Sequence, residues 1–339
     1  MSVIKRFDSV LVTGGAGYCG SLLVPQLLDL GYRVTVYDIL YFGDHFLPKD
    51  HPNLTVVQGD IRDTAKLATA MAGHQAVLHL ACISNDASFE LDEQLSTTIN
   101  FDAFEPMVAA AKAAGVRRFV YASSSSVYGV SEQPNVTEDH ALLPLTLYSK
   151  YKGECETVLK KYTDDGFVGV IYRPATVCGY GPRQRLDLSV NILTNHAVTN
   201  GRILVFGGEQ LRPNLHIQDY ADLCKLLLSA PDELVTDQIF NCGTENLTIR
   251  DIAGLVKRVV AEEFPGRADI DIVTTPSDDL RSYHINSDKI FRVLGFKPRH
   301  TVEDAVRDLC RAFREGALPD SMSDDWYYNI RTMKRLHAA

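Results

Sequence analysis

The stretch Val10-Leu11-Val12-Thr13-Gly14-Gly15-Ala16-Gly17-Tyr18-Cys19-Gly20 decides how this chain is expected to fold. Its first three residues are apolar and predict a buried parallel strand. Apolar residues then recur at helical spacing from Ser21 to Leu28, and Gly31 follows as the expected C-cap. The glycines therefore lie on a strand-to-helix turn, where the backbone can approach a phosphate and the helix N-terminus offers free N–H groups to a pyrophosphate.

The glycine spacing fits two patterns. Gly15, Gly17 and Gly20 match G-x-G-x-x-G, whereas Gly14, Gly17 and Gly20 match G-x-x-G-x-x-G. Glycine clusters are often plain turns, but the strand before and the helix after supply the context of a dinucleotide-binding fingerprint. The next predicted strand, 33–37, ends in Asp38. An acid there can bond both hydroxyls of the adenosine ribose and repels a 2′-phosphate, which favours NAD over NADP.

The composition is that of an ordinary globular protein. The 339 residues, 45% hydrophobic and 23% charged, predict one large or two modest domains. A net charge of -9 argues against nucleic-acid binding. We find no signal peptide and no apolar run long enough to span a membrane, so no membrane partner is expected. Seven cysteines without a C-x-x-C pair indicate reduced thiols in the cytoplasm and no metal site.

Strand and helix patterns alternate through the first half of the chain, which predicts an α/β fold with a doubly wound parallel sheet. We expect strands at 10–12, 33–37, 54–57, 76–81, 118–122 and 167–172, and helices at 21–28, 63–71, 90–114 and 148–163. The rhythm changes after residue 174. We therefore divide the chain into a dinucleotide-binding domain, 1–174, a smaller mixed α/β region, 175–320, with some segments returning to the first domain, and a C-terminal tail, 321–339. The aromatic residues Trp326-Tyr327-Tyr328 of the tail could serve packing or a dimer contact.

Two further stretches bear chemically useful groups. The run Ser123-Ser124-Ser125-Ser126 precedes Val127-Tyr128-Gly129 at the end of a predicted strand, and by itself could be a polar loop. Tyr148 and Lys152 are four residues apart, so on a helix they share one face. A Tyr-x-x-x-Lys pair alone is common and indicates little.

Together these pieces resemble one family. The glycine fingerprint, Asp38, Asp60-Ile61, the serine run, Tyr-x-x-x-Lys and Arg173–Gly179 are similar to the extended short-chain dehydrogenases/reductases, and within them to NAD-dependent nucleotide-sugar epimerases and dehydratases such as UDP-glucose 4-epimerase. The resemblance implies a Rossmann-type fold, tightly bound NAD, a nucleotide-sugar substrate and a role in carbohydrate biosynthesis. It also implies a homodimer formed through the helices expected at 90–114 and 148–163.

The resemblance assigns roles to individual residues. Tyr148 is the general base and acid, Lys152 lowers the pKa of Tyr148 and bonds the nicotinamide ribose, and Ser124 bonds the reacting oxygen. The implied cofactor-binding residues are Gly14, Gly17, Tyr18, Cys19, Gly20, Asp38, Asp60, Ile61, Leu80, Ala81, Cys82, Asn100, Ser123, Tyr148 and Lys152. The implied substrate-binding residues are Ser125, Thr176, Arg183, Asn191, Val205, Arg212 and Arg281. Arg183 and Arg185 could equally form structural ion pairs with Asp187.

The reaction is the less specific part of the resemblance. Dehydratases of the family carry an Asp-Glu pair where this chain has Ser125 and Ser126, so we expect no dehydration. Thr176 stands where UDP-sugar 4-epimerases carry Asn. We expect an epimerase, acting at C4 through a transient 4-keto-sugar. The alternatives are a net nucleotide-sugar 4-dehydrogenase or reductase and an NAD-binding protein without catalysis, against which Ser124, Tyr148 and Lys152 argue.

Overall fold

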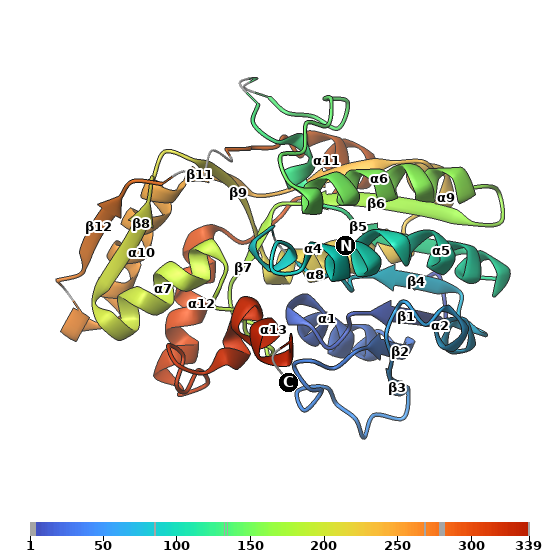
Figure 1. The fold of residues 1–339 in the computed structure, drawn as a ribbon, viewed down its shortest axis with the longest axis horizontal. Helices are drawn as coiled ribbons and strands as arrows, with labels where there is room; N and C mark the ends of the chain where they lie inside the picture. Colours follow the sequence, from blue (N-terminus) through green and yellow to red (C-terminus); the bar gives the residue numbers. More distant parts are fainter. Residues whose placement is uncertain are drawn as a thin grey trace.

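The centre of the molecule is a parallel sheet of seven strands. The computed structural model describes residues 5–84, 86–131, 133, 135–267, 269–277 and 282–337. The strands follow the order β10-β6-β5-β4-β1-β2-β3 and are paired in parallel throughout (Figure 1). Their bounds are β1 Ser9–Thr13, β2 Arg33–Asp38, β3 Leu54–Gln58, β4 Ala76–His79, β5 Arg118–Ala122, β6 Val168–Pro174 and β10 Ile239–Cys242. The order reverses between β1 and β4, and a parallel sheet binds its ligand at such a point.

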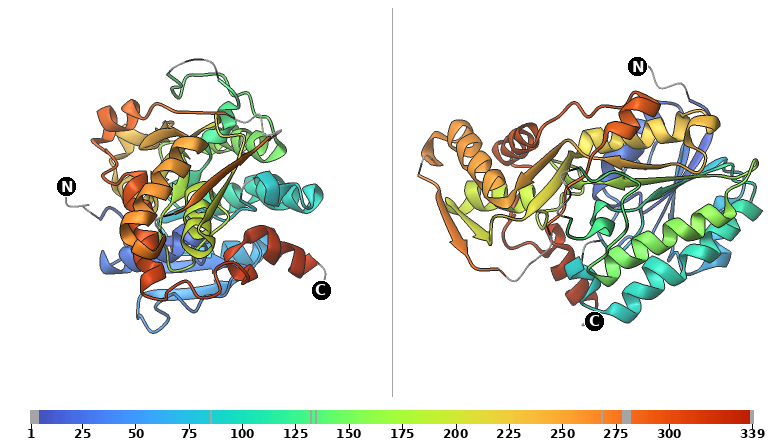
Figure 2. Two further views of the ribbon diagram at one scale, coloured as in Figure 1. Left: turned by 90° about the vertical axis from the view of Figure 1, so that its left-hand side faces the viewer. Right: turned by 90° about the horizontal axis from the view of Figure 1, so that it is seen from above.

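Helices cover both faces of this sheet. One apolar core joins α1 (Tyr18–Asp29), α8 (Ile217–Ser229) and α11 (Asp288–Leu294) to one face. A second core joins α2 (Thr64–Met71), α5 (Phe104–Ala113) and α6 (Leu147–Tyr162) to the other. The strands are therefore buried on both sides, as their near-continuous apolar sequence predicts. The expected α/β doubly wound fold is confirmed, including the helices on both faces (Figure 2).

A smaller region packs beyond the carboxyl ends of the strands (Figure 1). It contains a three-stranded sheet, β11-β9-β7, and a parallel pair, β12-β8. Its strands are β7 Thr176–Cys178, β8 Arg202–Phe206, β9 Leu211–His216, β11 Glu245–Thr248 and β12 Asp271–Thr275. The helices α7 (Ser189–Asn200), α10 (Ile249–Glu263) and α12 (Val302–Arg314) surround its apolar core, and α9 (Asp232–Val235) precedes β10. Strand β10 follows this region's first strands in sequence but belongs to the large sheet.

The helix expected over 90–114 is present in three parts. The chain is helical from Glu93 to Ala113, but a π-helical turn η1 (Thr98–Asp102) separates α4 (Glu93–Thr97) from α5, and a short helix α3 (Asp86–Phe89) precedes them. Asp92 starts α4 anew, because its side chain accepts the N–H of Leu95 as an N-cap. The side chain of Asn100 on the π turn bonds both backbone groups of Ile83, which ties this segment to the end of β4.

The C-terminal tail, described to residue 337, packs against the loop after β2. It forms a 3-10 turn η4 (Asp325–Tyr327) and the helix α13 (Asn329–His337). The Trp326 indole donates to the carbonyl of Phe42, and its ring lies 6.0 Å from that of Phe46. Tyr327 and Tyr328 are buried in a small core with Leu186 and Leu309. Packing within the subunit thus accounts for the aromatic residues of the tail.

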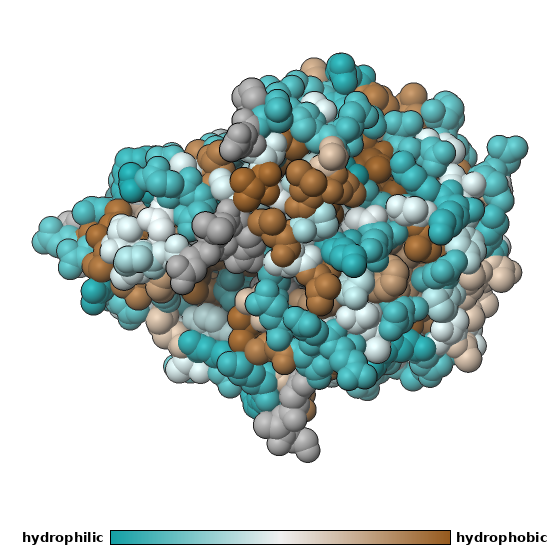
Figure 3. All heavy atoms as spheres, turned by 45° about the horizontal axis from the view of Figure 1, so that its top comes forward, coloured by the Kyte–Doolittle hydropathy of each residue, from teal (hydrophilic) through white to brown (hydrophobic). Residues whose placement is uncertain are grey.

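The surface is mostly hydrophilic. Figure 3 shows hydrophobic side chains gathered in one part of the face that it presents. The remaining elements are the short 3-10 turns η2 (Ser125–Tyr128) and η3 (Pro265–Arg267). Among the helices of the described residues, none has the length and apolar character needed to cross a bilayer. All seven cysteines are free thiols.

Candidate active site

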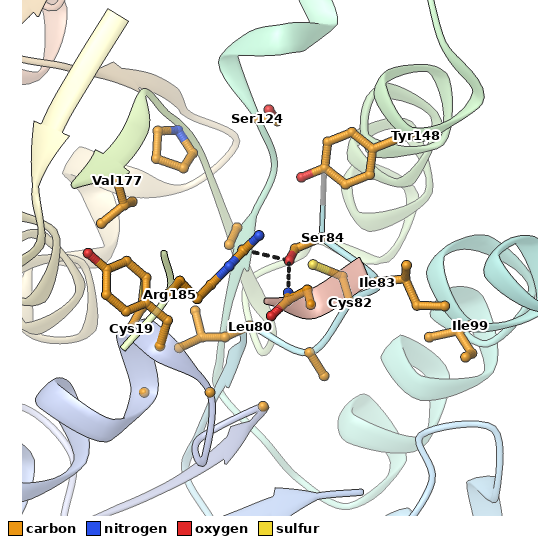
Figure 4. Close-up of a pocket in the computed structure, with 18 of the residues that line it drawn as sticks. Cys19, Leu80, Cys82, Ile83, Ser84, Ile99, Ser124, Tyr148, Val177 and Arg185 are labelled. Atoms are coloured by element: carbon orange, nitrogen blue, oxygen red, sulfur yellow. Dashed lines mark hydrogen bonds between the residues drawn. The ribbon is translucent and has the colours of Figure 1, made fainter. Parts of the chain in front are cut away.

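A cavity of about 360 Å³ lies over the carboxyl ends of the central strands. Its wall combines the turn between β1 and α1, the residues after β2 to β6, the segment after β7, and α13 (Figure 4). Of the predicted site residues, those that line it are Gly14, Gly17, Tyr18, Cys19, Gly20, Asp38, Asp60, Ile61, Leu80, Ala81, Cys82, Ser123, Ser124, Ser125, Tyr148, Lys152, Thr176 and Arg183. Residues from seven separate segments of the chain are thus brought to one place.

The glycine turn presents the second of the two spacings to the cavity. Gly14, Gly17 and Gly20 line it, whereas a Cβ on Gly15 would lie 2.8 Å from Val36 inside the fold. Gly14 has φ +72° and backs onto Ala81, where a Cβ would come within 2.6 Å of the backbone nitrogen. A Cβ on Gly20 would lie 2.5 Å from the Gly15 carbonyl oxygen. These positions demand glycine because the backbones of the turn, the helix and the next strand nearly touch.

Asp38 and Asp60 stand at the ends of neighbouring strands. The Asp38 carboxylate accepts N–H groups from Ala16 at 3.0 Å and Leu40 at 2.9 Å. Burial raises the pKa of Asp38, and these bonds oppose that shift. Asp60 is held by Arg62, with Nη2 2.6 Å from Oδ2, and this hydrogen bond lowers the pKa of Asp60. Both carboxylates are therefore fixed before any ligand arrives.

Tyr148 and Lys152 lie in the first turns of α6, which Thr146 caps by accepting the N–H of Ser149. The Lys152 ammonium is buried, donates to the carbonyl of Ala122 at 2.7 Å, and lies 5.9 Å from the centre of the Tyr148 ring. Burial raises the pKa of Tyr148 well above its ordinary value. The Cys82 thiol and the Asp86 carboxylate raise it further, while the Arg185 guanidinium opposes the shift. A phenolate at Tyr148 thus depends on cations within the cavity.

The serine run is held from beneath by a buried ion pair. Glu156, one turn after Lys152 on α6, accepts two bonds from Arg173, at 2.9 and 2.6 Å, and one from the Ser123 hydroxyl at 2.5 Å. Arg173 also donates to the Tyr128 hydroxyl at 2.7 Å. This network fixes the segment that carries Ser124 against the helix that carries Tyr148.

A chain of hydroxyl groups leads away from Ser124. Its Oγ lies 2.8 Å from that of Ser126, which lies 2.8 Å from that of Ser149. The Ser149 oxygen is 3.1 Å from Oγ1 of Thr146, and Thr146 donates to the Asp86 carboxylate. Hydroxyls at these separations can pass a proton from one to the next.

Two arginines reach the cavity from the segment after β7. Arg185 forms an ion pair with Asp187 at 2.9 Å, which was one of the two expected roles for this residue. It also bonds Ser84 (Figure 4). Arg183 bonds the side chain of Asn329 instead, and its guanidinium carbon lies 3.5 Å from the centre of the Phe42 ring. Burial lowers the pKa of Arg183, and the neighbouring Arg185 lowers it further.

Four of the predicted residues lie away from the cavity wall. Asn100 bonds the backbone of Ile83, and Asn191 is fully buried, where it bonds the backbone of Gly179 and the hydroxyl of Tyr18. Both amides shape loops behind the wall. Val205 is buried on β8. Arg212 lies on β9, 5.3 Å from the ring of Tyr283, which does line the cavity. Arg281 lies outside the described residues.

The sequence reasoning missed several residues of the wall. They come from the loop after β2, the residues after β4, α8, the segment before α11 and the C-terminal helix, and include Phe42, Ser84, Asp86, Tyr220, Tyr283, Asn329 and Met333. Ser84 and Asp86 immediately follow Leu80–Cys82 and could have been found by extending that stretch. Asn329 carries no local sequence signal.

The shape of the glycine turn and the position of Asp38 fit a bound dinucleotide. The glycine turn leaves no room for side chains, so a phosphate can approach the first turn of α1. Asp38 lies at the end of β2, where a ribose diol is bound in folds of this kind. In addition, Nη2 of Arg185 is buried and has no hydrogen-bond partner among the described residues.

Comparisons with known proteins found a matching family model and several similar proteins. The family model described as NAD dependent epimerase/dehydratase family matches residues 10–243. A UDP-glucose 4-epimerase of Rhizobium leguminosarum bv. trifolii is 27% identical over 88% of this chain and 95% of its own length. A Streptomyces venezuelae dTDP-glucose 4,6-dehydratase, solved with NAD bound, is 27% identical with a TM-score of 0.79, covering 91% of this chain and 97% of that one. A Thermotoga maritima UDP-glucose 4-epimerase, solved with UDP-glucose, is 25% identical with a TM-score of 0.81 over 91% of this chain and 99% of that one.

Proposed function

The chain belongs to the NAD dependent epimerase/dehydratase family, and from that premise we propose that it is a nucleotide-sugar epimerase acting at C4 of the sugar. The observation that carries the proposal is the meeting of Ser124, Tyr148 and Lys152 in one cavity, beside a turn fit for a dinucleotide. The epimerases and dehydratases among its relatives support the substrate class.

In the proposed reaction, Tyr148 takes the proton of the O4 hydroxyl while the C4–H bond breaks. When bound, NAD supplies the acceptor and later the donor of that hydride. Ser124 bonds O4 throughout, and the cations of Lys152 and Arg185 stabilise the Tyr148 phenolate. The keto-sugar then presents its other face, and Tyr148 returns the proton to O4. No atom is gained or lost, so the product has the mass of the substrate.

The neighbouring serines favour epimerisation over dehydration. A 4,6-elimination needs an acid and a base beside C5 and C6, and the hydroxyls of Ser125 and Ser126 can be neither near neutral pH. Ser126 is moreover engaged with Ser124 and Ser149.

One observation favours a second candidate, a net oxidoreductase that makes or consumes the 4-keto-sugar. Such an enzyme must discharge a proton in every turnover, whereas an epimerase returns it. The hydroxyl chain from Ser124 to Asp86 could carry that proton to the edge of the cavity.

The test is to incubate the purified protein with a panel of nucleotide sugars and to analyse both products and co-purified cofactor by mass. An isomer of unchanged mass, with NAD retained by the protein, is the expected result. A product lighter by two hydrogens, formed once per protein unless an acceptor is added, would establish the oxidoreductase instead. Loss of water would refute the argument from Ser125 and Ser126.

We also propose that the protein is a homodimer in which α5 and α6 pair with their counterparts. A surface groove runs between these helices. Its lining is mixed, with Phe101, Pro106, Ala109, Val158 and Tyr162 beside the carboxylates of Asp102 and Glu105. Two helix faces of this kind can form a four-helix bundle with a second copy. Sedimentation as a monomer at micromolar concentration would contradict the proposal.

A further inference from the structure

The Arg185 guanidinium is a buried cation that is only partly satisfied. The residue is 7% exposed. Its Nε donates to Asp187 at 2.9 Å and its Nη1 to Ser84 at 2.8 Å, while Nη2 has no hydrogen-bond partner among the described residues. A buried donor left unpaired is destabilising, and native proteins contain few of them. Because Arg185 lines the cavity, a bound ligand can supply the missing acceptor.

The guanidinium lies where the reacting hydroxyl of the substrate is expected. Figure 4 shows it beside Ser84, with the hydroxyl groups of Tyr148 and Ser124 directed to the same space. Burial raises the pKa of Tyr148 and the charge of Arg185 opposes that shift, which agrees with their closeness. Ser124 and Tyr148 are the groups that bond O4 in the reaction proposed above, and the inference rests on that proposed function. The acceptor for Nη2 therefore belongs to a part of the sugar next to C4.

This wall of the cavity carries an excess of positive charge. Arg183 and Arg185 are both buried, but among the described residues only Arg185 bonds a carboxylate, that of Asp187. Arg183 bonds the neutral amide of Asn329, and burial together with the neighbouring Arg185 lowers its pKa to about 9. A buried charge is costly unless an opposite charge compensates it, so an anion is favoured here.

The groups expected near C5 and C6 of the sugar leave room for a negative charge. Ser125 and Ser126 line the cavity where dehydratases of the family carry an Asp-Glu pair, which would repel an anion. Serine hydroxyls are neutral and can donate to a carboxylate instead. Asp86 also lines the cavity, but its carboxylate already accepts the hydroxyl of Thr146.

The C-terminal helix fixes both partners of the guanidinium. The backbone N–H of Asn329 donates to Asp187 at 2.9 Å, and its amide nitrogen donates to Ser84 at 3.1 Å. Arg185 bonds the same two groups. The guanidinium is thus held before a ligand arrives, and such preorganisation lowers the entropic cost of binding.

We propose that the sugar of the substrate carries a carboxylate on C5, as in a nucleotide-linked hexuronic acid, and that Arg185 binds this carboxylate. In a hexose, C5 is a direct neighbour of C4 and bears the carbon that is a carboxylate in the uronic acid. Its oxygens match the planar fork of arginine and accept a charge-assisted bond from Nη2. The substrate's diphosphate fits less well, because it is attached at C1, across the ring from C4.

The first experiment compares pairs of nucleotide sugars that differ only at C6, such as UDP-glucuronate with UDP-glucose and GDP-mannuronate with GDP-mannose. Binding to the NAD-loaded Tyr148→Phe protein is measured by titration calorimetry, so that turnover does not disturb the titration. We expect the uronate to bind about 10- to 100-fold more tightly than its neutral partner, the effect of one charge-assisted bond. Equal affinity, or a preference for the neutral sugar, would overturn the proposal.

The second experiment adds Arg185→Gln to the Tyr148→Phe protein, after thermal melting has shown that the variant folds. The preference for the uronate should disappear while the neutral sugar binds nearly as before. Arg185→Lys keeps the charge and should retain part of the preference. Arg335→Gln makes the same change as Arg185→Gln at an exposed position of α13 and should alter neither affinity. Equal weakening of both sugars by Arg185→Gln would show that the guanidinium bonds a group that both share, such as O4, and would refute the carboxylate site.

Product analysis by mass, with the unsubstituted holoenzyme, separates this inference from the proposed reaction. A uronate is expected to give an isomer of unchanged mass. Loss of two hydrogens or of carbon dioxide from the uronate would refute epimerisation, whereas the carboxylate site would stand. Conversion of neutral nucleotide sugars without conversion of their uronate partners would refute the carboxylate site and leave the epimerase standing.

Discussion

The buried pair of Glu156 and Arg173 offers the sharpest test of how the active-site wall is held. Replacing Glu156 with Gln keeps the side chain's shape and removes its charge. Glu156 is 3% exposed and accepts three bonds, two from Arg173 and one from Ser123. Although burial disfavours the charged guanidinium, the bonds to Glu156 hold the pKa of Arg173 above its ordinary value.

The magnitude follows from what is left behind. Charge-assisted bonds contribute roughly 1.5–3 kcal/mol each, and Glu156→Gln weakens three of them while Arg173 stays buried with its charge. Removing one partner of a buried ion pair costs about 3–5 kcal/mol, so we expect the free energy of unfolding to fall by that amount. Glu154→Gln is the matched control on the same helix. Its side chain is 41% exposed and 3.7 Å from Lys150, so its change should stay within about 1 kcal/mol.

The assay is urea denaturation, extended to a double-mutant cycle. Combining Glu156→Leu with Arg173→Met removes both charges together, and the pair should cost at least about 2 kcal/mol less than the sum of the two single changes. A cost below about 1 kcal/mol for Glu156→Gln, or strict additivity of the pair, would refute the reasoning.

Three further predictions concern the cavity. Tyr148→Phe should lower kcat by about 10²–10⁴-fold without loss of bound NAD, measured by product formation and cofactor absorbance, and near wild-type activity would remove Tyr148 from its role. Because burial raises the pKa of Tyr148 and its phenolate is the working base, kcat/KM should rise with pH through neutrality, and Arg185→Gln should move this rise to higher pH. A pH profile unchanged by Arg185→Gln would contradict the inference that Arg185 lowers the pKa of Tyr148. Gly20→Ala should lower the free energy of unfolding by about 1–3 kcal/mol and weaken NAD binding, since the new Cβ meets the Gly15 carbonyl. Gly254→Ala, on the open surface of a helix, should raise the free energy of unfolding by up to about 1 kcal/mol, measured by the same urea denaturation.

The parts of the site that the sequence predicts well are those built from adjacent residues. The strand, glycine turn and helix at 10–28 form one local unit, so their spacing alone indicates where a phosphate would lie. Tyr148 and Lys152 likewise share a helix face because they are four residues apart. The position of Asp38 is predictable because the residues around it indicate where the strand ends.

Contacts between distant segments escaped prediction for a physical reason. Ser84 and Asn329 are 245 residues apart, and nothing in the sequence near either residue indicates that their side chains are in contact. Asn191 shows the converse problem, because a buried amide that fixes a loop and an amide that meets a ligand look the same in sequence. The helix expected at 90–114 starts later because Asp92 is its N-cap, and it is interrupted by the π-helical turn Thr98–Asp102, which helical spacing in the sequence does not indicate.

Asn329 bonds Asp187, Ser84 and Arg183, and these bonds can form only late in synthesis of the chain. The glycine turn, Ser84 and Arg185 leave the ribosome well before Asn329, and at translation speeds of 5–20 residues per second the delay after Arg185 is roughly 7 to 30 s. During that interval the nascent chain contains the glycine turn and Arg185 but not Asn329, which bonds both hydrogen-bond partners of Arg185. The part of the cavity wall that Asn329 and Met333 form is therefore made last among the segments that line the cavity.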